Sequence, residues 1–361
     1  DYDGIISDVP IVSLSTLMLA PELIRIQEKP LSAWVTPDKA NAIRAEFLRQ
    51  CDKLDGLSDG IINNYMASRA IFDVTDGSGP ADPWAALREP DGKDQKPEVN
   101  SAPDRLTDGQ VQTLEFTYSR LRFTSPLANG VKSFGMWLPT IDPESFGTIS
   151  PARYNGQEGA PDNAQVHSSL GVLGVTGFLM QDLSANPLDY TEDDAMIKRR
   201  KQVSEWLDAT DPDLNDFCKH GGKIIITVGT QDFIASSGAQ LDYYQSLLNE
   251  MGQKKLDKFA RLYVVPQGGH GLSGRSYKMN GDGESVSVRN IPAPNSGDKL
   301  DLMISWVEEG IAPAKTLVID IDGRIGVKKE GQGYLLCSYP YYPKYTGGEQ
   351  DQVSSYTSSS R

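Results

Sequence analysis

The sequence predicts an α/β protein built on a parallel sheet with crossover helices, because buried strands alternate with amphipathic helices in its second half. Strands are expected over residues 221–229 and 261–266, where apolar residues run together and end at Gly or Pro. The helix between them is indicated by apolar residues at helical spacing: Leu241, Tyr244, Leu248 and Met251. A last helix is expected over residues 302–309, before Gly310. This alternation is typical of parallel sheets.

A third strand and two further helices are expected upstream. Residues 4–9 form a short apolar run that Pro10 closes, which fits a buried strand. One helix should begin after Thr36, with a proline at its first position. Another should begin after Thr107, which can form a capping box with Gln110.

The middle of the sequence does not continue the pattern. Residues 73–105 and 123–165 are rich in Pro, Gly, Asp, Asn and Ser without a sustained period, so long irregular loops are expected there. Three strands are also fewer than the roughly five or six of a typical sheet. The missing strands are therefore expected upstream of residue 1.

Composition limits the partners. The 361 residues include 49 acidic and 35 basic side chains, for a net charge of −14, so neither nucleic acid nor an anionic membrane is an expected partner. The longest apolar runs stop well short of the roughly 20 residues that a membrane helix needs. The basic cluster 198–201 is expected on the solvated face of a helix. Cys51, Cys218 and Cys337 lack the spacing of a metal cluster.

Asp232 and His270 form the strongest candidate site. Each follows one of the two strands expected in the second half, and 38 positions separate them. Ligands bind at the carboxyl ends of parallel strands, so both side chains should project to one rim. Serine hydrolases of the α/β type carry an acid and then a histidine in this order, and the acid orients the histidine that acts as general base. The alternative is that Asp232 caps the next helix and His270 is an ordinary loop residue.

The remaining histidines and serines are weaker candidates for catalytic residues. His220 is expected at a helix C-terminus, where the dipole favours it, and His167 at the surface of a polar loop. No G-x-S-x-G nucleophile elbow is present, since Ser273 follows the histidine and Ser58 lies in an acidic loop. This chain alone should be inactive unless residues upstream supply the serine.

A second candidate site is acidic. Asp52, Asp55 and Asp59 lie within eight residues, and a glycine follows each of the last two. Three such carboxylates repel one another unless they are solvated or joined by a hard cation, and calcium accepts six to eight oxygen ligands. The spacing differs from that of an EF-hand. From the residues alone, a calcium site and a solvated acidic turn both stay open.

The motif Asp52-x-x-Asp-Gly-x-x-Asp-Gly-Ile resembles the calcium loop in the lid of the tannase and feruloyl esterase family and of the related mono(hydroxyethyl) terephthalate hydrolase. Other segments match this family in order: Asp3-Gly-Ile-Ile, Gly221-Gly-Lys-Ile-Ile, Gly229-x-x-Asp232, Tyr243-Tyr244, Arg261-Leu to Val265-Pro266, Gly269-His270, Trp306-Val-Glu-x-Gly-x-Ala-Pro313 and Cys337-x-Tyr-Pro. Together they span residues 3–340.

The resemblance implies the C-terminal part of an α/β-hydrolase fold with a large inserted lid. In this family the nucleophilic serine lies a short helix upstream of the segment that matches residues 1–10, so a preceding segment or a companion N-terminal chain should supply it. The expected divisions are core 1–23, lid with calcium loop 24–180, core 181–345 and a polar tail 346–361. The end of that tail, from Tyr356, is expected to be disordered.

The resemblance also implies residue roles. Asp232 and His270 would be members of the catalytic triad. A structural Ca²⁺ would take carboxylates and two carbonyls from the acidic loop, supplied by Asp52, Asp55, Leu57, Asp59 and Ile61. The family usually has a disulfide-bonded cysteine after the catalytic histidine, and here Gly271 takes that place. That tie must be absent, and pairing among the three cysteines stays open.

The resulting hypothesis is a secreted or periplasmic, serine-type carboxylic ester hydrolase for small aromatic esters, of hydroxycinnamate, gallate or terephthalate-like acids. Phe134, Met136 and Trp137 are the candidates for holding the acyl group, and packing inside the lid is their alternative role. A rival hypothesis from another class is a noncatalytic binding protein that kept the esterase fold.

Overall fold

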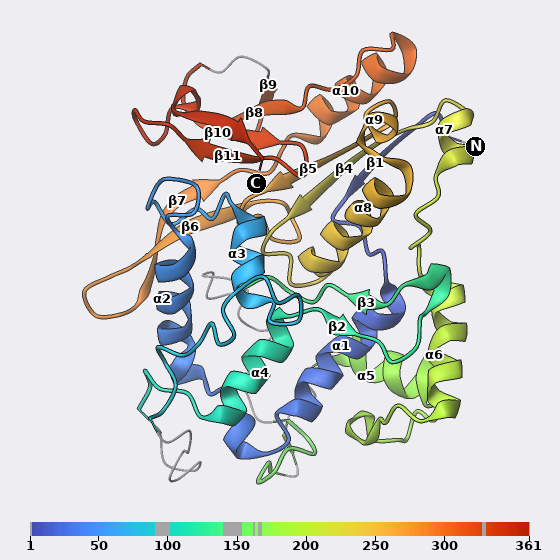
Figure 1. The fold of residues 1–361 in the computed structure, drawn as a ribbon, viewed down its shortest axis with the longest axis vertical. Coiled ribbons are helices and arrows are strands. Elements are labelled where there is room, and N and C mark those ends of the chain that lie inside the picture. The colour runs from blue at the N-terminus through green and yellow to red at the C-terminus, as the bar shows by residue number, and fades with distance from the viewer. Residues whose placement is uncertain are drawn as a thin grey trace.

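The computed structural model describes residues 2–90, 102–139, 154–161, 163–164, 168–326 and 330–360. Most of the strands lie in the upper part of Figure 1, and most helices of the first two hundred residues lie in the lower part. After its first strand the chain therefore leaves the sheet, and it returns only after a long helical excursion.

Three parallel strands form the central sheet in the order β1-β4-β5. They are β1 (Gly4–Asp8), β4 (Lys223–Gly229) and β5 (Ala260–Val265), which confirms the three expected strands. Every residue of β5 is buried, as in a strand covered on both faces. The protein thus has the expected α/β architecture.

Two helices cover this sheet (Figure 1). Successive side chains of a strand point to opposite faces. Ile226 therefore belongs to the core beneath α8 (Ser237–Met251), while its neighbour Ile225 belongs to the core that contains Trp306 of α10 (Ser296–Glu308). Both expected helices are confirmed, and α10 begins six residues earlier than the sequence indicates.

The C-terminal third adds smaller antiparallel sheets. Their strands are β6 (Gly274–Met279) with β7 (Ser285–Ile291), β8 (Thr316–Asp320) with β9 (Ile325–Gly326) and β10 (Gly333–Cys337), and β11 (Tyr342–Tyr345) with β12 (Tyr356–Ser359). The last pair corrects the expectation of a disordered end, because Tyr356–Ser359 forms the strand β12. Tyr356 is buried and its ring packs on Tyr345, which anchors β12 despite its polar composition.

The segment between β1 and β4 is mainly helical in its described part. Its elements are α1 (Leu14–Gln27), η1 (Leu31–Ala33), η2 (Pro37–Lys39), α2 (Ala40–Cys51), α3 (Tyr65–Phe72), α4 (Asp108–Tyr118), β2 (Leu121–Arg122), η3 (Ala128–Gly130), β3 (Ser133–Phe134), α5 (Ser169–Leu173), the π-helical η5 (Gly174–Leu179), η6 (Pro187–Asp189), α6 (Asp194–Leu207) and α7 (Asn215–Lys219). Two short helices lie further on: α9 (Gln253–Leu256) and η7 (Val353–Ser355).

The local predictions in this helical segment have mixed outcomes. The capping box of Thr107 and Gln110 is present at the start of α4. Thr36 precedes the single turn η2 and caps no backbone N–H group; its hydroxyl donates to the carboxylate of Asp38 instead. Arg200, expected on a solvated face, is buried, where it pairs with Glu192 and lies 4.8 Å from the ring centroid of Phe123.

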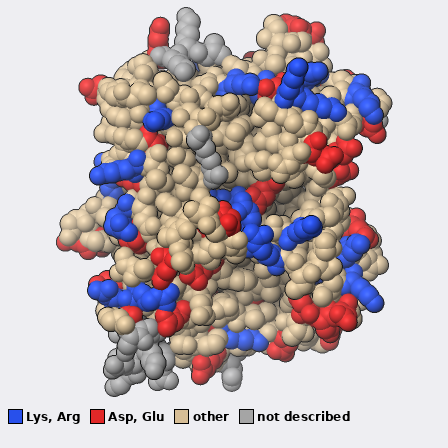
Figure 2. Space-filling model, in the orientation of Figure 1, with Lys and Arg blue, Asp and Glu red and all other residues tan. Residues whose placement is uncertain are grey.

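The surface carries both signs of charge, and acidic and basic side chains are interspersed over the face in Figure 2. Over the residues whose placement is described, the helices are all too short or too polar to cross a bilayer.

Candidate active site

Asp232 and His270 meet at the carboxyl ends of adjacent strands. β4 ends at Gly229 and β5 at Val265, and each strand leads into a short loop that carries one of the two side chains. The Nδ1 atom of His270 lies 3.1 Å from Oδ1 and 3.3 Å from Oδ2 of Asp232. The structure therefore brings together the two residues that the sequence singled out.

The carboxylate of Asp232 is held from several sides. It is buried, and its Oδ1 accepts hydrogen bonds from the backbone N–H groups of Ile234 and Ala235, both at 3.0 Å. Its Oδ2 accepts a bond of 3.0 Å from the side-chain amide of Gln240 on α8. The cap of α8 is a different residue, Ser236, so Asp232 does not have the alternative role of helix cap.

His270 is placed to move a proton. Its side chain is 37% exposed, whereas that of Asp232 is fully enclosed. Because Nδ1 faces the carboxylate, Nε2 is the nitrogen left to exchange a proton with a reacting group. Within the described residues, no serine hydroxyl is hydrogen-bonded to this imidazole.

The two loops touch backbone to backbone. A Cβ atom on Gly229 would come within 2.1 Å of the Gly268 carbonyl oxygen, so only glycine fits there. The N–H group of Gln231 donates to the same carbonyl at 3.0 Å. Gly271, by contrast, has open space around it, and no steric need explains glycine at that position.

The three residues expected to bind the acyl group are buried. Phe134, Met136 and Trp137 are exposed by 2%, 0% and 5% and share a core with residues of α1 and α8. The indole N–H of Trp137 donates to the carbonyl of Phe233 at 2.8 Å, directly after Asp232. These side chains thus support the Asp232 loop from behind, and a role in binding substrate stays a prediction.

Two exposed apolar residues beside Asp232 were not among the residues predicted for the site. Phe233 and Ile234 follow Asp232 and are 41% and 44% exposed. Their position beside a candidate catalytic acid was the available signal. They offer exposed apolar surface directly after the acid that faces His270.

The other two histidines and the cysteines are not part of the candidate site. Nδ1 of His220 lies 2.7 Å from the Asp216 carbonyl at the end of α7, which confirms its position at a helix C-terminus. His167 lies outside the described residues. Cys51, Cys218 and Cys337 form no disulfide with one another, and burial raises the pKa of the Cys51 thiol to about 12.

The acidic loop folds around its own backbone. Asp52 accepts the N–H of Gly60 at 2.8 Å, and Asp59 accepts the N–H of Ile61 at 3.1 Å. Asp55 accepts the N–H of Leu57 at 3.0 Å and the side-chain amide of Asn63 at 2.7 Å. The loop is therefore ordered by its carboxylates, unlike a freely solvated turn.

Burial makes these carboxylates costly to ionise. It raises the pKa of Asp52 to about 6 and that of Asp55 to about 7, and it also raises the pKa of Asp59. Oδ2 of Asp59 is buried and has no hydrogen-bond partner in the described structure. A hard cation would offset both features, although the described residues contain no ready-made group of three acidic, Cys or His side chains around one point.

An acid hydrogen-bonded to a histidine across neighbouring parallel strands is the arrangement found in serine hydrolases of the α/β class. Comparison with family models agrees. The model of the tannase and feruloyl esterase family matches residues 1–359, so the chain belongs to that family.

The sequence identity to individual relatives is low. The chain is 27% identical over 360 residues to an uncharacterized esterase of Agrobacterium fabrum and 26% identical over 372 residues to mono(2-hydroxyethyl) terephthalate hydrolase of Piscinibacter sakaiensis. These alignments cover 98% and 96% of this chain but only 58% and 57% of the relatives. The chain thus spans less than two thirds of their length.

Solved structures show the same fold. The structure of feruloyl esterase B from Aspergillus oryzae matches 99% of this chain and 64% of its own, with a TM-score of 0.69 and 21% identity. Tannin acyl hydrolase from Aspergillus niger matches 100% of this chain and 60% of its own, with a TM-score of 0.64 and 21% identity.

Proposed function

We propose that this chain is the acid and histidine part of a serine-type carboxylic ester hydrolase that acts on small aromatic esters. The hydrogen bond between Asp232 and His270 carries the proposal. Membership of the family supports it, since relatives are named feruloyl esterase and mono(2-hydroxyethyl) terephthalate hydrolase. The nucleophilic serine would come from sequence that precedes this chain or from a companion N-terminal chain.

The proposed reaction is acyl transfer to water through a serine ester. His270 takes the serine proton through Nε2 as the hydroxyl attacks the ester carbonyl, and later returns it to the leaving alcohol. Asp232 holds the ring orientation and stabilises the imidazolium that forms. The same histidine then activates the water that releases the acid product. Backbone amides outside this chain would hold the oxyanion.

The fold around the site would be an α/β-hydrolase core, over residues 1–23 and 181–345, with an inserted lid over residues 24–180. The lid lies between β1 and β4 in sequence, which fits an insertion. Apolar lid residues with Phe233 and Ile234 would hold the aromatic group of the substrate, and Trp137 would brace them through the Phe233 carbonyl.

A structural Ca²⁺ in the acidic loop is part of the proposal. Asp52, Asp55 and Asp59 would give carboxylates, and Leu57 and Ile61 would give carbonyl oxygens. The buried, unpartnered oxygen of Asp59 and the raised pKa values of the loop support a cation there. The protein itself would be secreted or periplasmic, as its similarity to fungal feruloyl esterases suggests.

Hydrolysis by the full-length polypeptide tests the proposal. Wild type should cleave a methyl hydroxycinnamate or gallate ester, and the variant His270→Ala should lose about 10⁴-fold or more in kcat at an unchanged melting temperature. Absence of hydrolysis by the folded wild type across aromatic esters would favour the noncatalytic binding protein instead.

A further inference from the structure

Gln267 lies where three loops meet, three residues before His270. It follows Pro266 at the end of β5, is 1% exposed and has a left-handed backbone, with φ of 56°. A non-glycine residue in that conformation is strained and is retained only where its surroundings fix it. Its contacts show what fixes it.

The backbone of Gln267 links two loops: the one that carries His270, here called the histidine loop, and the one that carries Asp232. Its N–H group donates to Oγ1 of Thr230 at 2.7 Å, two residues before Asp232. The side chain reaches in another direction, where its amide donates to the Gly60 carbonyl at 2.7 Å. That carbonyl belongs to the acidic loop, more than two hundred residues away in sequence, so one buried residue links three separate segments.

The backbone segments around Gln267 are closely packed. A Cβ atom on Gly60 would lie 2.1 Å from the Tyr277 carbonyl oxygen of β6, and one on Gly274 would lie 1.9 Å from the Gln267 carbonyl oxygen. Both glycines therefore let backbones touch, and displacement of one segment must displace the next. Packed contacts of this kind transmit small movements.

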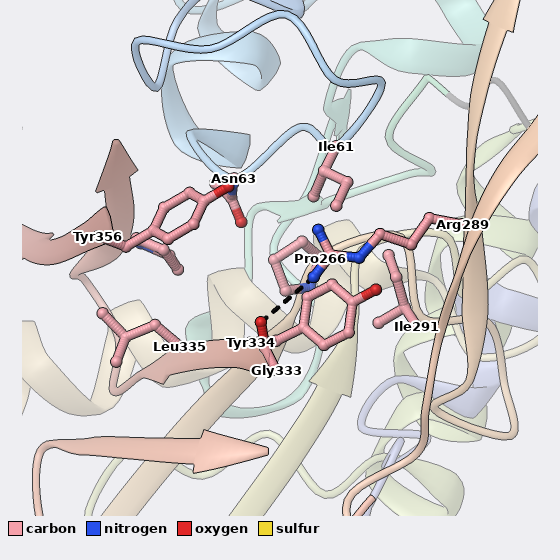
Figure 3. Close-up of a pocket in the computed structure, with 10 residues that line it drawn as sticks. Ile61, Asn63, Pro266, Arg289, Ile291, Gly333, Tyr334, Leu335 and Tyr356 are labelled. Atoms are coloured by element: carbon pink, nitrogen blue, oxygen red, sulfur yellow. Dashed lines mark hydrogen bonds between the residues drawn. The ribbon is translucent and has the colours of Figure 1, made fainter. Parts of the chain in front are cut away.

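Figure 3 shows a small cavity lined by Pro266, the residue directly before Gln267. Ile61 and Asn63 of the acidic loop and Pro266 of the histidine loop face Arg289 and Tyr334 across a cavity of about 20 Å³. That volume admits about one water molecule, whereas ligand pockets have several hundred Å³. This cavity beside Gln267 is therefore too small to hold an ester substrate.

We infer that Gln267 is a positioning residue for His270: through Gly60 it ties the acidic loop to the loop that carries the imidazole, and through Thr230 it holds that loop against the Asp232 loop. The inference rests on the proposed hydrolase function. Since an error of about 1 Å in a reacting group can lower a rate about 100-fold, these ties affect turnover directly.

The test replaces Gln267 with methionine in the full-length polypeptide. Methionine has a similar length and is also unbranched, so the variant mainly loses the bond to Gly60. Gln157→Met is the matched control, because Gln157 is also buried and donates its amide to a backbone carbonyl, that of Glu28, at 3.2 Å. Two readouts are taken: kcat and KM on an aromatic ester, and the low-field proton resonance of the His270 Nδ1–H group.

We expect Gln267→Met to lower kcat about 10-fold with little change in KM, and to broaden or shift the Nδ1–H resonance upfield. Gln157→Met should leave both readouts unchanged, even where it lowers the melting temperature by a similar amount. Equal effects of the two variants on kcat and on the resonance would overturn the inference. If wild type proves inactive, the hydrolase proposal fails on its own, and the resonance still decides whether Gln267 positions His270.

Discussion

At the scale of single residues, the enclosure of Asp232 is the feature that matters most. Its oxygens accept two backbone N–H groups and one side-chain amide in addition to facing His270. A carboxylate held in this way is ordered before any substrate binds. Orientation of the imidazole is therefore built into the fold.

Asp232→Asn should lower kcat by about 10³- to 10⁴-fold, because an amide in place of the carboxylate no longer stabilises the imidazolium or fixes the right tautomer. The size of the side chain is kept, so the melting temperature should change little. Steady-state kinetics of the full-length protein measure the effect. Asp182→Asn is the control, since Asp182 also accepts turn N–H groups but is exposed. A decrease of less than tenfold in Asp232→Asn would contradict the assigned role.

Residue positions were predictable where the chain has regular structure around them. Asp232 and His270 could be placed because each follows a strand whose apolar run is visible in the sequence. For Phe134 and Trp137 the sequence left packing and substrate binding both open, because an aromatic residue in an irregular segment looks the same in either role. Arg200 was misplaced for a related reason, since its partner Glu192 lies outside the helix.

At the scale of elements, α1 carries an unusual buried charge. Glu22 and Glu28 are both 0% exposed and flank Arg25, whose guanidinium bonds Glu22 at 2.5 Å. Burial raises the pKa of Glu22 from 4.5 to about 7 and that of Glu28 to about 8. One arginine beside two carboxyl groups leaves at least one of them without a counter-charge. Burial therefore favours the protonated form of these carboxyl groups, most strongly that of Glu28.

This burial makes stability depend on pH. Above about pH 4.5 the unfolded chain releases protons that folded Glu22 and Glu28 retain, so the free energy of unfolding should decrease as pH rises from about 4.5 to about 8. Each group contributes a slope of at most about 1.4 kcal/mol per pH unit. Glu28→Gln should flatten the decrease, as measured by denaturant unfolding between pH 5 and 8. Identical slopes in wild type and Glu28→Gln would contradict this account.

Element type was predictable where local signals are strong, and it failed where tertiary contacts decide. The capping box at Thr107 gave the start of α4 correctly, since its partners lie within one turn. The polar run after Tyr356 gave no sign of β12, because that strand depends on pairing with β11 and on the packing of the Tyr345 ring.

At the scale of the whole molecule, the acidic loop joins distant parts of the chain. Its Asp55 carbonyl accepts the N–H of Tyr345, and its Gly60 carbonyl accepts the amide of Gln267. The loop thus contacts both the C-terminal strands and the histidine loop. Residue order alone could not have revealed these contacts, because they join segments more than two hundred residues apart.

Removal of calcium should therefore destabilise the molecule. We expect a chelator to lower the melting temperature of the full-length protein by several degrees, with recovery on addition of Ca²⁺. Asp59→Asn should reduce the response, because it removes one of the proposed carboxylate ligands. Differential scanning calorimetry provides the measurement, with Asp182→Asn as the control of equal charge change. An unchanged melting temperature in chelator would argue against the cation.

The central claim is that Asp232 and His270 activate a serine outside this chain. Labelling of the full-length polypeptide with a fluorophosphonate, followed by peptide mapping, tests it most directly. The account predicts one adduct on a serine upstream of the segment that matches residue 1, formed by wild type and nearly lost in His270→Ala. An adduct on a serine within these 361 residues, or equal labelling of the two proteins, would contradict it.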